Sequence, residues 1–218
     1  MANNLIFVGG ASSSGKSTFV KELKKEYSCD TYRRLDAFKD CAIKKGYDEA
    51  NMFSYISSEE ADNQFISFCT QHNCVVSDVH YALQRNKDFV SIDGDLSYVA
   101  TLSNNLINTL LNLNTNISAV LLHCSPEVIY SRMLDRFNRG ERSMRSKSVE
   151  EVKMQSIWEK KMWEQLIHEF DIMPIELNSE LFTPDELVDQ FLNFNQSTKS
   201  KKKVLVINNG KNNTRNNK

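Results

Sequence analysis

One stretch near the N-terminus constrains this chain more than any other, a glycine- and serine-rich loop between an apolar run and a helix-like segment. The run is Leu5 to Val8, the loop is Gly9 to Thr18, and the segment is Phe19 to Tyr27. The loop has the spacing G-x-x-x-x-G-K-S of a phosphate-binding P-loop, with its fixed positions at Gly10, Gly15, Lys16 and Ser17. A linker could fit this pattern by chance, but it would not need a buried strand before it and a helix after it. The stretch therefore predicts a polyphosphate site.

Each residue type in this loop has a physical role in binding a nucleotide. Glycine tolerates positive φ and lets backbone amides approach a ligand, and the helix that follows adds N–H groups and the positive end of its dipole. Lys16 is expected to reach the β and γ phosphates, while the Ser17 hydroxyl ligates the Mg²⁺ that bridges them. The expected cofactors are ATP and Mg²⁺. The expected nucleotide-binding residues are Gly10, Ser12, Ser13, Ser14, Gly15, Lys16, Ser17 and Thr18.

The composition is that of an ordinary globular chain, and 218 residues suffice for one main domain. No run approaches the ~18 apolar residues that cross a bilayer, and the N-terminus lacks a signal-type apolar stretch. We therefore expect a cytoplasmic protein without a membrane partner. The five cysteines are odd in number and irregular in spacing, which favours reduced thiols over a disulfide framework. Cys69 and Cys74 lack a second Cys/His pair at ligand spacing, so we expect no zinc site.

Charge separates the C-terminal end from the rest of the chain. Residues 195–218 carry seven basic and no acidic side chains, which leaves 20 basic and 28 acidic residues, a net charge of −8, on residues 1–194. We divide the chain into one domain over residues 1–195 and a basic Asn/Lys-rich tail over residues 196–218, which we expect to be flexible. Clustered lysines attract a phosphate backbone, so the tail leaves nucleic acid open as a partner, although a solubilising extension is favoured.

Strand and helix patterns alternate along the domain. Helices are expected to begin near Lys16, Ala37, Ser58, Leu96, Pro126, Val149 and Pro184. Strands are expected at Leu5 to Val8, Thr31 to Leu35, Cys74 to Asp78, Ile117 to His123 and Ile172 to Leu177. Continuous apolar runs are typical of strands buried on both faces. The alternation predicts a three-layer α/β/α fold with about five parallel strands covered by helices on both sides.

Two further features lead from phosphate binding towards a reaction. Asp78 ends an apolar strand where a carboxylate can hold Mg²⁺, although a turn aspartate would look the same. Five arginines lie within fourteen residues, at Arg132, Arg136, Arg139, Arg142 and Arg145. Planar guanidinium groups stabilise the charge on phosphoryl oxygens during transfer, and the alternative is a solvated basic helix face.

The class of P-loop protein is narrowed by what the sequence lacks. No guanine-recognition motif of the Asn-Lys-x-Asp type is present, which argues against a GTPase. The chain is shorter than the usual motor or AAA module, so we expect neither of these. A small kinase remains.

With its features in this order, the chain resembles the nucleoside monophosphate kinases and, among them, most of all the archaeal-type adenylate kinases. The resemblance rests on the P-loop at Gly10 to Thr18, on Val75 to His80 as an apolar strand that ends in Asp-x-His, and on Ser118 to Arg132 leading into the arginines. It covers most of residues 4–177. It implies a P-loop kinase fold and a lid at about 136–148, whose closure brings Arg136, Arg139, Arg142 and Arg145 onto the phosphates of ATP.

The implied activity is transfer of the γ-phosphoryl group of ATP to a small acceptor, a nucleoside monophosphate such as AMP. A phosphate oxygen is already a nucleophile, so positioning and charge neutralisation would supply the catalysis. A hydroxyl acceptor on a small metabolite or an RNA end would need a base, for which Asp36 is the candidate, although Asp36 fits a helix N-cap equally well. A nucleotide-binding switch is the non-enzymatic alternative, and the arginines argue against it.

Overall fold

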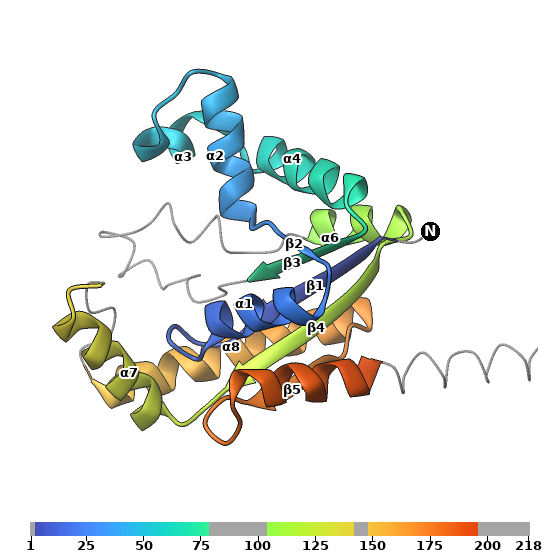
Figure 1. Ribbon diagram of the computed structural model, residues 1–218. Coiled ribbons are helices and arrows are strands. Elements are labelled where there is room, and N and C mark those ends of the chain that lie inside the picture. Colours follow the sequence, from blue (N-terminus) through green and yellow to red (C-terminus); the bar gives the residue numbers. More distant parts are fainter. Residues whose placement is uncertain (1–2, 79–103, 142–147, 196–218) are drawn as a thin grey trace, which may run out of the picture.

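The centre of the molecule is a parallel sheet of five strands in the order β2-β3-β1-β4-β5. The structure is a computed structural model and describes residues 3–78, 104–141 and 148–195 (Figure 1). The strands are β1 Asn4–Gly9, β2 Asp30–Thr31, β3 Cys74–Asp78, β4 Asn116–His123 and β5 Pro174–Asn178. This arrangement confirms the expected sheet of about five parallel strands, and the structure places the first strand in its middle.

Helices connect the strands and cover both faces of the sheet (Figure 1). They are α1 Lys16–Glu26, α2 Arg34–Lys44, the 3₁₀ turn η1 Glu49–Asn51, α3 Met52–Tyr55, α4 Ser58–Gln71, α6 Asn104–Asn112, α7 Pro126–Asn138, α8 Val149–Phe170 and a last helix over 184–195. In the described ranges, each helix is too short or too polar to cross a membrane.

Alternate residues of the central strand feed two separate cores. Leu5 and Phe7 of β1 belong to a core that includes buried side chains of α2, α4, α6 and α8. Ile6 and Val8 point to the other face, where they share a core with Phe19 of α1 and with the helix over 184–195. Because successive side chains of a strand point to opposite faces, an apolar run without polar gaps requires helices on both sides. The three-layer fold predicted from the sequence is thereby confirmed.

Several local signals in the sequence set the ends of these elements. Ser57 caps α4, accepting a hydrogen bond from the Glu60 amide while the Glu60 carboxylate returns to the Ser57 amide. Pro126 opens α7 at its first turn. Gly46 ends α2 with φ 74°, a left-handed conformation that favours glycine.

The predicted second strand was wrong in its extent. Thr31 to Leu35 was expected to be extended, but β2 covers only Asp30–Thr31 and α2 begins at Arg34. The reason is a local capping box, in which Asp36 binds the backbone and side chain of Arg33 and turns the chain into a helix. The expected helix from Leu96 is present as α6 from Asn104 onward. Residues 79–103, lid residues 142–147 and the tail over 196–218 lie outside the described residues.

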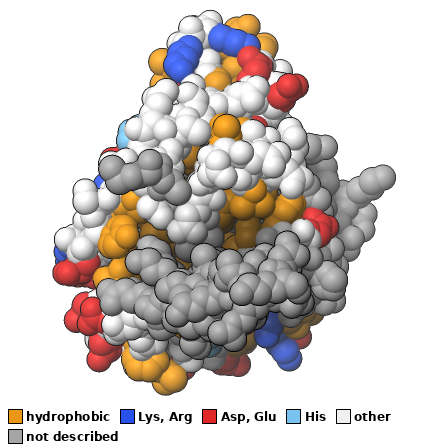
Figure 2. All heavy atoms as spheres, turned by 90° about the vertical axis from the view of Figure 1, so that its right-hand side faces the viewer, with side chains coloured by type: hydrophobic (Ala, Val, Ile, Leu, Met, Phe, Trp, Pro, Cys, Tyr) orange, Lys and Arg blue, Asp and Glu red, His pale blue; other side chains and the backbone are white. Residues whose placement is uncertain are grey.

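Figure 2 shows the face at the right of Figure 1, where the N-terminus lies and β1 begins. Hydrophobic side chains are visible there between polar atoms. Leu113 just before β4 and Met173 just before β5 are both exposed, which places apolar surface at the amino ends of these strands. The polar cleft described next lies at the opposite, carboxyl end of the sheet.

Candidate functional site

The P-loop follows β1 at the carboxyl end of the sheet and leads directly into α1. Three of its residues have positive φ: Gly10 at 133°, Ser13 at 68° and Gly15 at 100°. A Cβ added to Gly10 would lie 2.2 Å from the carbonyl oxygen of Leu122, so the neighbouring strand β4 leaves room for glycine alone. At Gly9 the added Cβ would lie 2.2 Å from the Trp163 ring of α8. The start of the loop is therefore packed against β4 and α8, two elements distant in sequence.

Lys16 is held inside this loop and is only 4% exposed. Its ammonium donates to the carbonyl of Gly10 and, at 2.8 Å, to the carbonyl of Ala11. The Ser14 amide also donates to the Ala11 carbonyl at 3.1 Å, which closes the loop on itself. Among the described residues, the buried Ser14 Oγ finds no hydrogen-bond partner. The lysine thus lies at the base of the loop with its charge satisfied by backbone oxygens.

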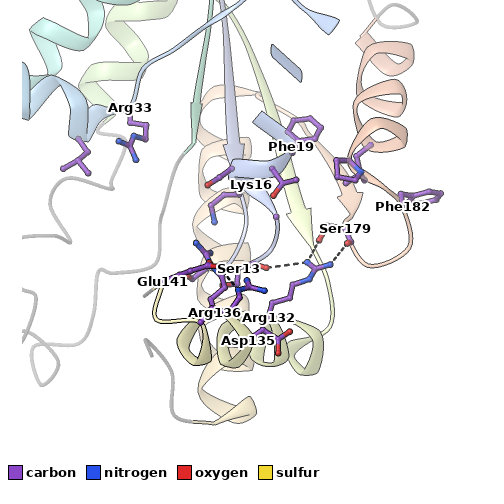
Figure 3. A pocket seen from close by; sticks show the side chains of 18 residues that line it. Ser13, Lys16, Phe19, Arg33, Arg132, Asp135, Arg136, Glu141, Ser179 and Phe182 are labelled. Carbon is purple, nitrogen blue, oxygen red and sulfur yellow. Dashed lines mark hydrogen bonds and ion pairs between the residues drawn. The ribbon is translucent and has the colours of Figure 1, made fainter. Parts of the chain in front are cut away.

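A cleft of about 870 Å³ opens above the P-loop and is lined by residues from four parts of the chain. Figure 3 shows Lys16 between Arg33, at the start of α2, and the α7 residues Arg132 and Arg136. Phe182 lines a third side, in the segment between β5 and the last helix. Cationic side chains therefore border the cleft on two facing walls.

Arg132 links the P-loop to the segment after β5. Its guanidinium donates to the Ser13 carbonyl at 3.5 Å, to the Ser179 hydroxyl at 3.4 Å and to the Ser179 carbonyl at 2.8 Å (Figure 3). Cys124 lies beside it, with its sulfur 3.7 Å from the guanidinium. One arginine of α7 thus fixes two loops that follow different strands.

The other arginines of this wall form exposed ion pairs. Glu141 accepts from Arg139 at 2.6 Å and from Arg136 at 3.4 Å. The hydrogen bond from Arg139 is the main reason that the pKa of Glu141 is lowered. The Glu141 carboxylate thereby occupies guanidinium groups that line the cleft and are suited to phosphoryl oxygens.

Arg33, on the facing wall, pairs with Asp36, which is not among the described residues that line the cleft. The Asp36 carboxylate accepts from the Arg33 side chain at 2.6 and 2.9 Å and from the Arg33 amide at 2.9 Å. Burial raises the pKa of Asp36, but the side-chain and backbone hydrogen bonds from Arg33 outweigh it, so the pKa is lowered overall. The carboxylate caps α2 at the third helical position, not as the N-cap itself.

The structure brings most of the residues predicted from the sequence together. The cleft is lined by Ser12, Ser13, Gly15, Lys16, Ser17, Thr18, Arg136 and Arg139. Gly10 and Ser14 are buried within the loop. Asp78 ends β3 and pairs in register with Val8, directly before the loop. Arg142 and Arg145 lie outside the described residues.

The cleft residues that were not singled out from the sequence include Arg33, Ser179 and Phe182. Arg33 follows β2 and Ser179 follows β5, and the carboxyl ends of parallel strands meet at one edge of the sheet. The position of Arg33 and Ser179 near the carboxyl ends of predicted strands could therefore have identified both as candidate site residues. Phe182 carries no comparable signal, because an exposed aromatic residue in a loop has no distinctive spacing.

Comparison with known families gives one match. A model of the AAA domain family matches residues 6–157, which include the P-loop, the central strands and α7. This match contradicts the expectation, drawn from chain length, that AAA modules could be set aside. A comparison with curated proteins finds no match.

Three solved structures with the same fold are two kinases and a protein in complex with a nucleotide, each of low sequence identity. YorR from Bacillus subtilis, in complex with phosphorylated GDP, is 14% identical, with a TM-score of 0.57 over 88% of this chain and 95% of that one. Shikimate kinase from Acinetobacter baumannii is 13% identical, with a TM-score of 0.52 over 91% and 96%. Deoxyadenosine kinase from M. mycoides is 15% identical, with a TM-score of 0.51 over 88% and 99%. The fold is that of the P-loop kinases.

Proposed function

The chain belongs to the AAA domain family, and from this premise we propose that it is an ATP- and Mg²⁺-dependent phosphotransferase whose acceptor is a nucleoside monophosphate such as AMP. The proposal rests on the cleft in which Lys16 lies between arginines of two walls. One polyphosphate would need only the P-loop and its nearby arginines. On the other wall, the Arg33 guanidinium, now paired with Asp36, would exchange that carboxylate for a second anionic substrate.

The donor would bind on the P-loop side of the cleft. Loop amides and the start of α1 would bind its phosphates, and Lys16 would exchange the Gly10 and Ala11 carbonyls for phosphate oxygens. The Ser17 hydroxyl, exposed at the start of α1, and Asp78, in register with Val8, would hold Mg²⁺. Phe182 offers an apolar surface for the base at the far side of the cleft.

The arginines would stabilise the charge that spreads over the transferred group. Arg136 and Arg139 already line the cleft, and we propose that Arg142 and Arg145 join them when the lid over 136–148 closes on the nucleotide. Arg136 and Arg139 would then release Glu141 and bind the phosphates instead. Closure would also exclude water, which otherwise competes as an acceptor.

The acceptor would bind against Arg33 at the start of α2. A monophosphate needs no general base, whereas a hydroxyl acceptor would require Asp36 to accept a proton. The Asp36 carboxylate is held by Arg33 and its pKa is lowered, so it is a weak base at neutral pH. This pairing favours the monophosphate over the alternative of a metabolite hydroxyl or an RNA end, in which Asp36 is catalytic.

Coupled ADP production tests the proposal with Mg·ATP and a panel of nucleoside monophosphates, hydroxyl-bearing metabolites and 5′-hydroxyl RNA. We expect rapid, saturable turnover with a monophosphate. Product with hydroxyl acceptors alone would overturn the acceptor class, and slow hydrolysis unaffected by any acceptor would indicate a switch. Deleting residues 197–218 should leave turnover with a small acceptor intact, because the tail contributes charge suited to a nucleic acid instead.

A further inference from the structure

Two cysteines are brought side by side at the amino ends of β2 and β3. Cys74 is the first residue of β3, and Cys29 directly precedes β2. The strands pair in parallel with Asp30 opposite Val75 and Thr31 opposite Val76. Continuing this register by one residue places Cys29 opposite Cys74. The chain separates them by the whole of α2 and α4, so the sequence alone gives no sign of the pairing.

The spacing of this pair suits a covalent bond. Neighbouring strands lie about 4.8 Å apart, and the Cα atoms of a disulfide lie roughly 4.4 to 6.8 Å apart. Both side chains pack in the core that contains Val76 and Phe19. A bond between their sulfurs would therefore join side chains that meet in the folded chain.

The cysteines differ in how readily they ionise. The hydrogen bond from Cys74 lowers the pKa of Cys29; burial and Asp30 act against this, and Lys24 supports it. Burial instead raises the pKa of Cys41 and Cys124, and raises that of Cys69 to about 12. Cys29 is half-buried, whereas Cys69 and Cys74 are buried. Because the thiolate is the nucleophile, Cys29 is the preferred site of attack on an oxidant.

We propose that Cys29 and Cys74 form a reversible redox modification site, in which Cys29 reacts with a peroxide and Cys74 resolves the product as a disulfide. The Cys29 thiolate attacks one oxygen of hydrogen peroxide, the O–O bond breaks, and hydroxide leaves to become water as Cys29 becomes a sulfenic acid. The Cys74 sulfur then attacks the Cys29 sulfur, the S–O bond breaks, and a second water leaves. Two thiols lose two electrons and two protons, and peroxide gains them.

The cross-link would close a loop that contains α2 and α4 and begins a few residues before Arg33. It would stabilise the protein by restricting the unfolded chain. A dithiol reductant would restore both thiols, which agrees with the reduced cysteines expected from the sequence. The site lies at the end of the sheet opposite the cleft and does not depend on the proposed phosphotransfer.

Peroxide treatment of the full-length folded protein tests the site. Peptide mass mapping without reductant should find Cys29 joined to Cys74, and dithiothreitol should reverse the link. The oxidised protein should also melt at a higher temperature than the reduced one. The Cys74→Ser variant should accumulate a dimedone-reactive sulfenic acid at Cys29, while Cys29→Ser should give neither product. Cys41→Ser, which changes another half-buried thiol, should behave as the wild type.

The wild-type mapping decides the matter even if a serine variant fails to fold. Cross-links in the folded protein that join other cysteines, or no cross-link at Cys29, would overturn the proposal. The same yield of the Cys29–Cys74 link in urea-unfolded protein would also overturn it, because the fold would then not be what selects the pair.

Discussion

The two sides of the cleft are built in different ways. On the P-loop side, Lys16 is 4% exposed and bound to backbone carbonyls, and the loop packs against Trp163 and β4. On the α7 side, the Arg139 side chain is 61% exposed and its partner Glu141 is 45% exposed. Exposed ion pairs are weak and exchange partners easily, whereas a closely packed loop keeps its conformation. We infer that the P-loop is a fixed receptor and that the α7 wall adjusts to what is bound.

Replacing the P-loop lysine should have the largest effect. Lys16→Ala removes the cation aimed at the phosphates, so phosphoryl transfer should fall by roughly 100-fold or more. Because the carbonyls of Gly10 and Ala11 lose the lysine as a donor, the melting temperature should also fall slightly. ADP production and thermal melting measure both effects. Lys21→Ala, which changes an exposed lysine on the same helix, is the matched control. Retained transfer would remove the fixed-receptor role of the loop.

Arg132→Met tests the hydrogen bonds by which α7 holds the P-loop and the segment after β5. The substitution keeps the apolar stem but leaves the Ser179 carbonyl without its donor, which costs about 1–3 kcal/mol when the group stays buried. Nucleotide binding should weaken roughly tenfold as the P-loop and the segment after β5 loosen. Titration of a fluorescent ATP analogue checks the affinity. Lys153→Met on α8, an exposed cation 4.0 Å from Glu150, should change neither quantity.

Asp36→Asn separates a capping role from a catalytic one. The folded-state pKa is lowered, so the carboxylate stabilises the protein above its unfolded pKa of about 4 and loses this effect as the pH falls through the folded value. At neutral pH the variant should be about 1 kcal/mol less stable, and the difference should shrink below about pH 4. Denaturant unfolding across this pH range measures it, with Asp189→Asn as a surface control. Loss of turnover with a hydroxyl acceptor by more than tenfold would restore Asp36 as a base.

Glu141→Gln should have the smallest effect and the opposite sign. The substitution removes a competitor for Arg136 and Arg139, so nucleotide should bind roughly two- to threefold more tightly. High salt should reduce the gain, since exposed ion pairs are screened. Equilibrium titration at low and high ionic strength measures both. Glu150→Gln on α8 provides the matched change of charge. Weaker binding by the Glu141 variant would show that the ion pairs support the α7 wall instead of restraining it.

Much of the fold could be predicted from the sequence because local signals coincide with it. β3 has the predicted bounds, α1, α7 and α8 begin at the predicted residues, and β4 begins one residue earlier than predicted. In each case an apolar run or a capping pattern is confined to neighbouring residues. The prediction for the second strand was wrong because another local signal was missed. The contact between Arg33 and Asp36 starts a helix and overrides the extended preference of the residues before it.

The candidate site also contains features that neighbouring residues predict and contacts between segments distant in sequence. The P-loop could be predicted from the sequence alone, since its glycines, lysine and serine lie within one short segment. It also named the arginines of α7 as candidates. The contact of Arg132 with Ser179 and the pairing of Cys29 with Cys74 are seen in the tertiary structure alone. These contacts depend on strand order and side-chain direction, which arise when distant segments pack and which no local spacing records.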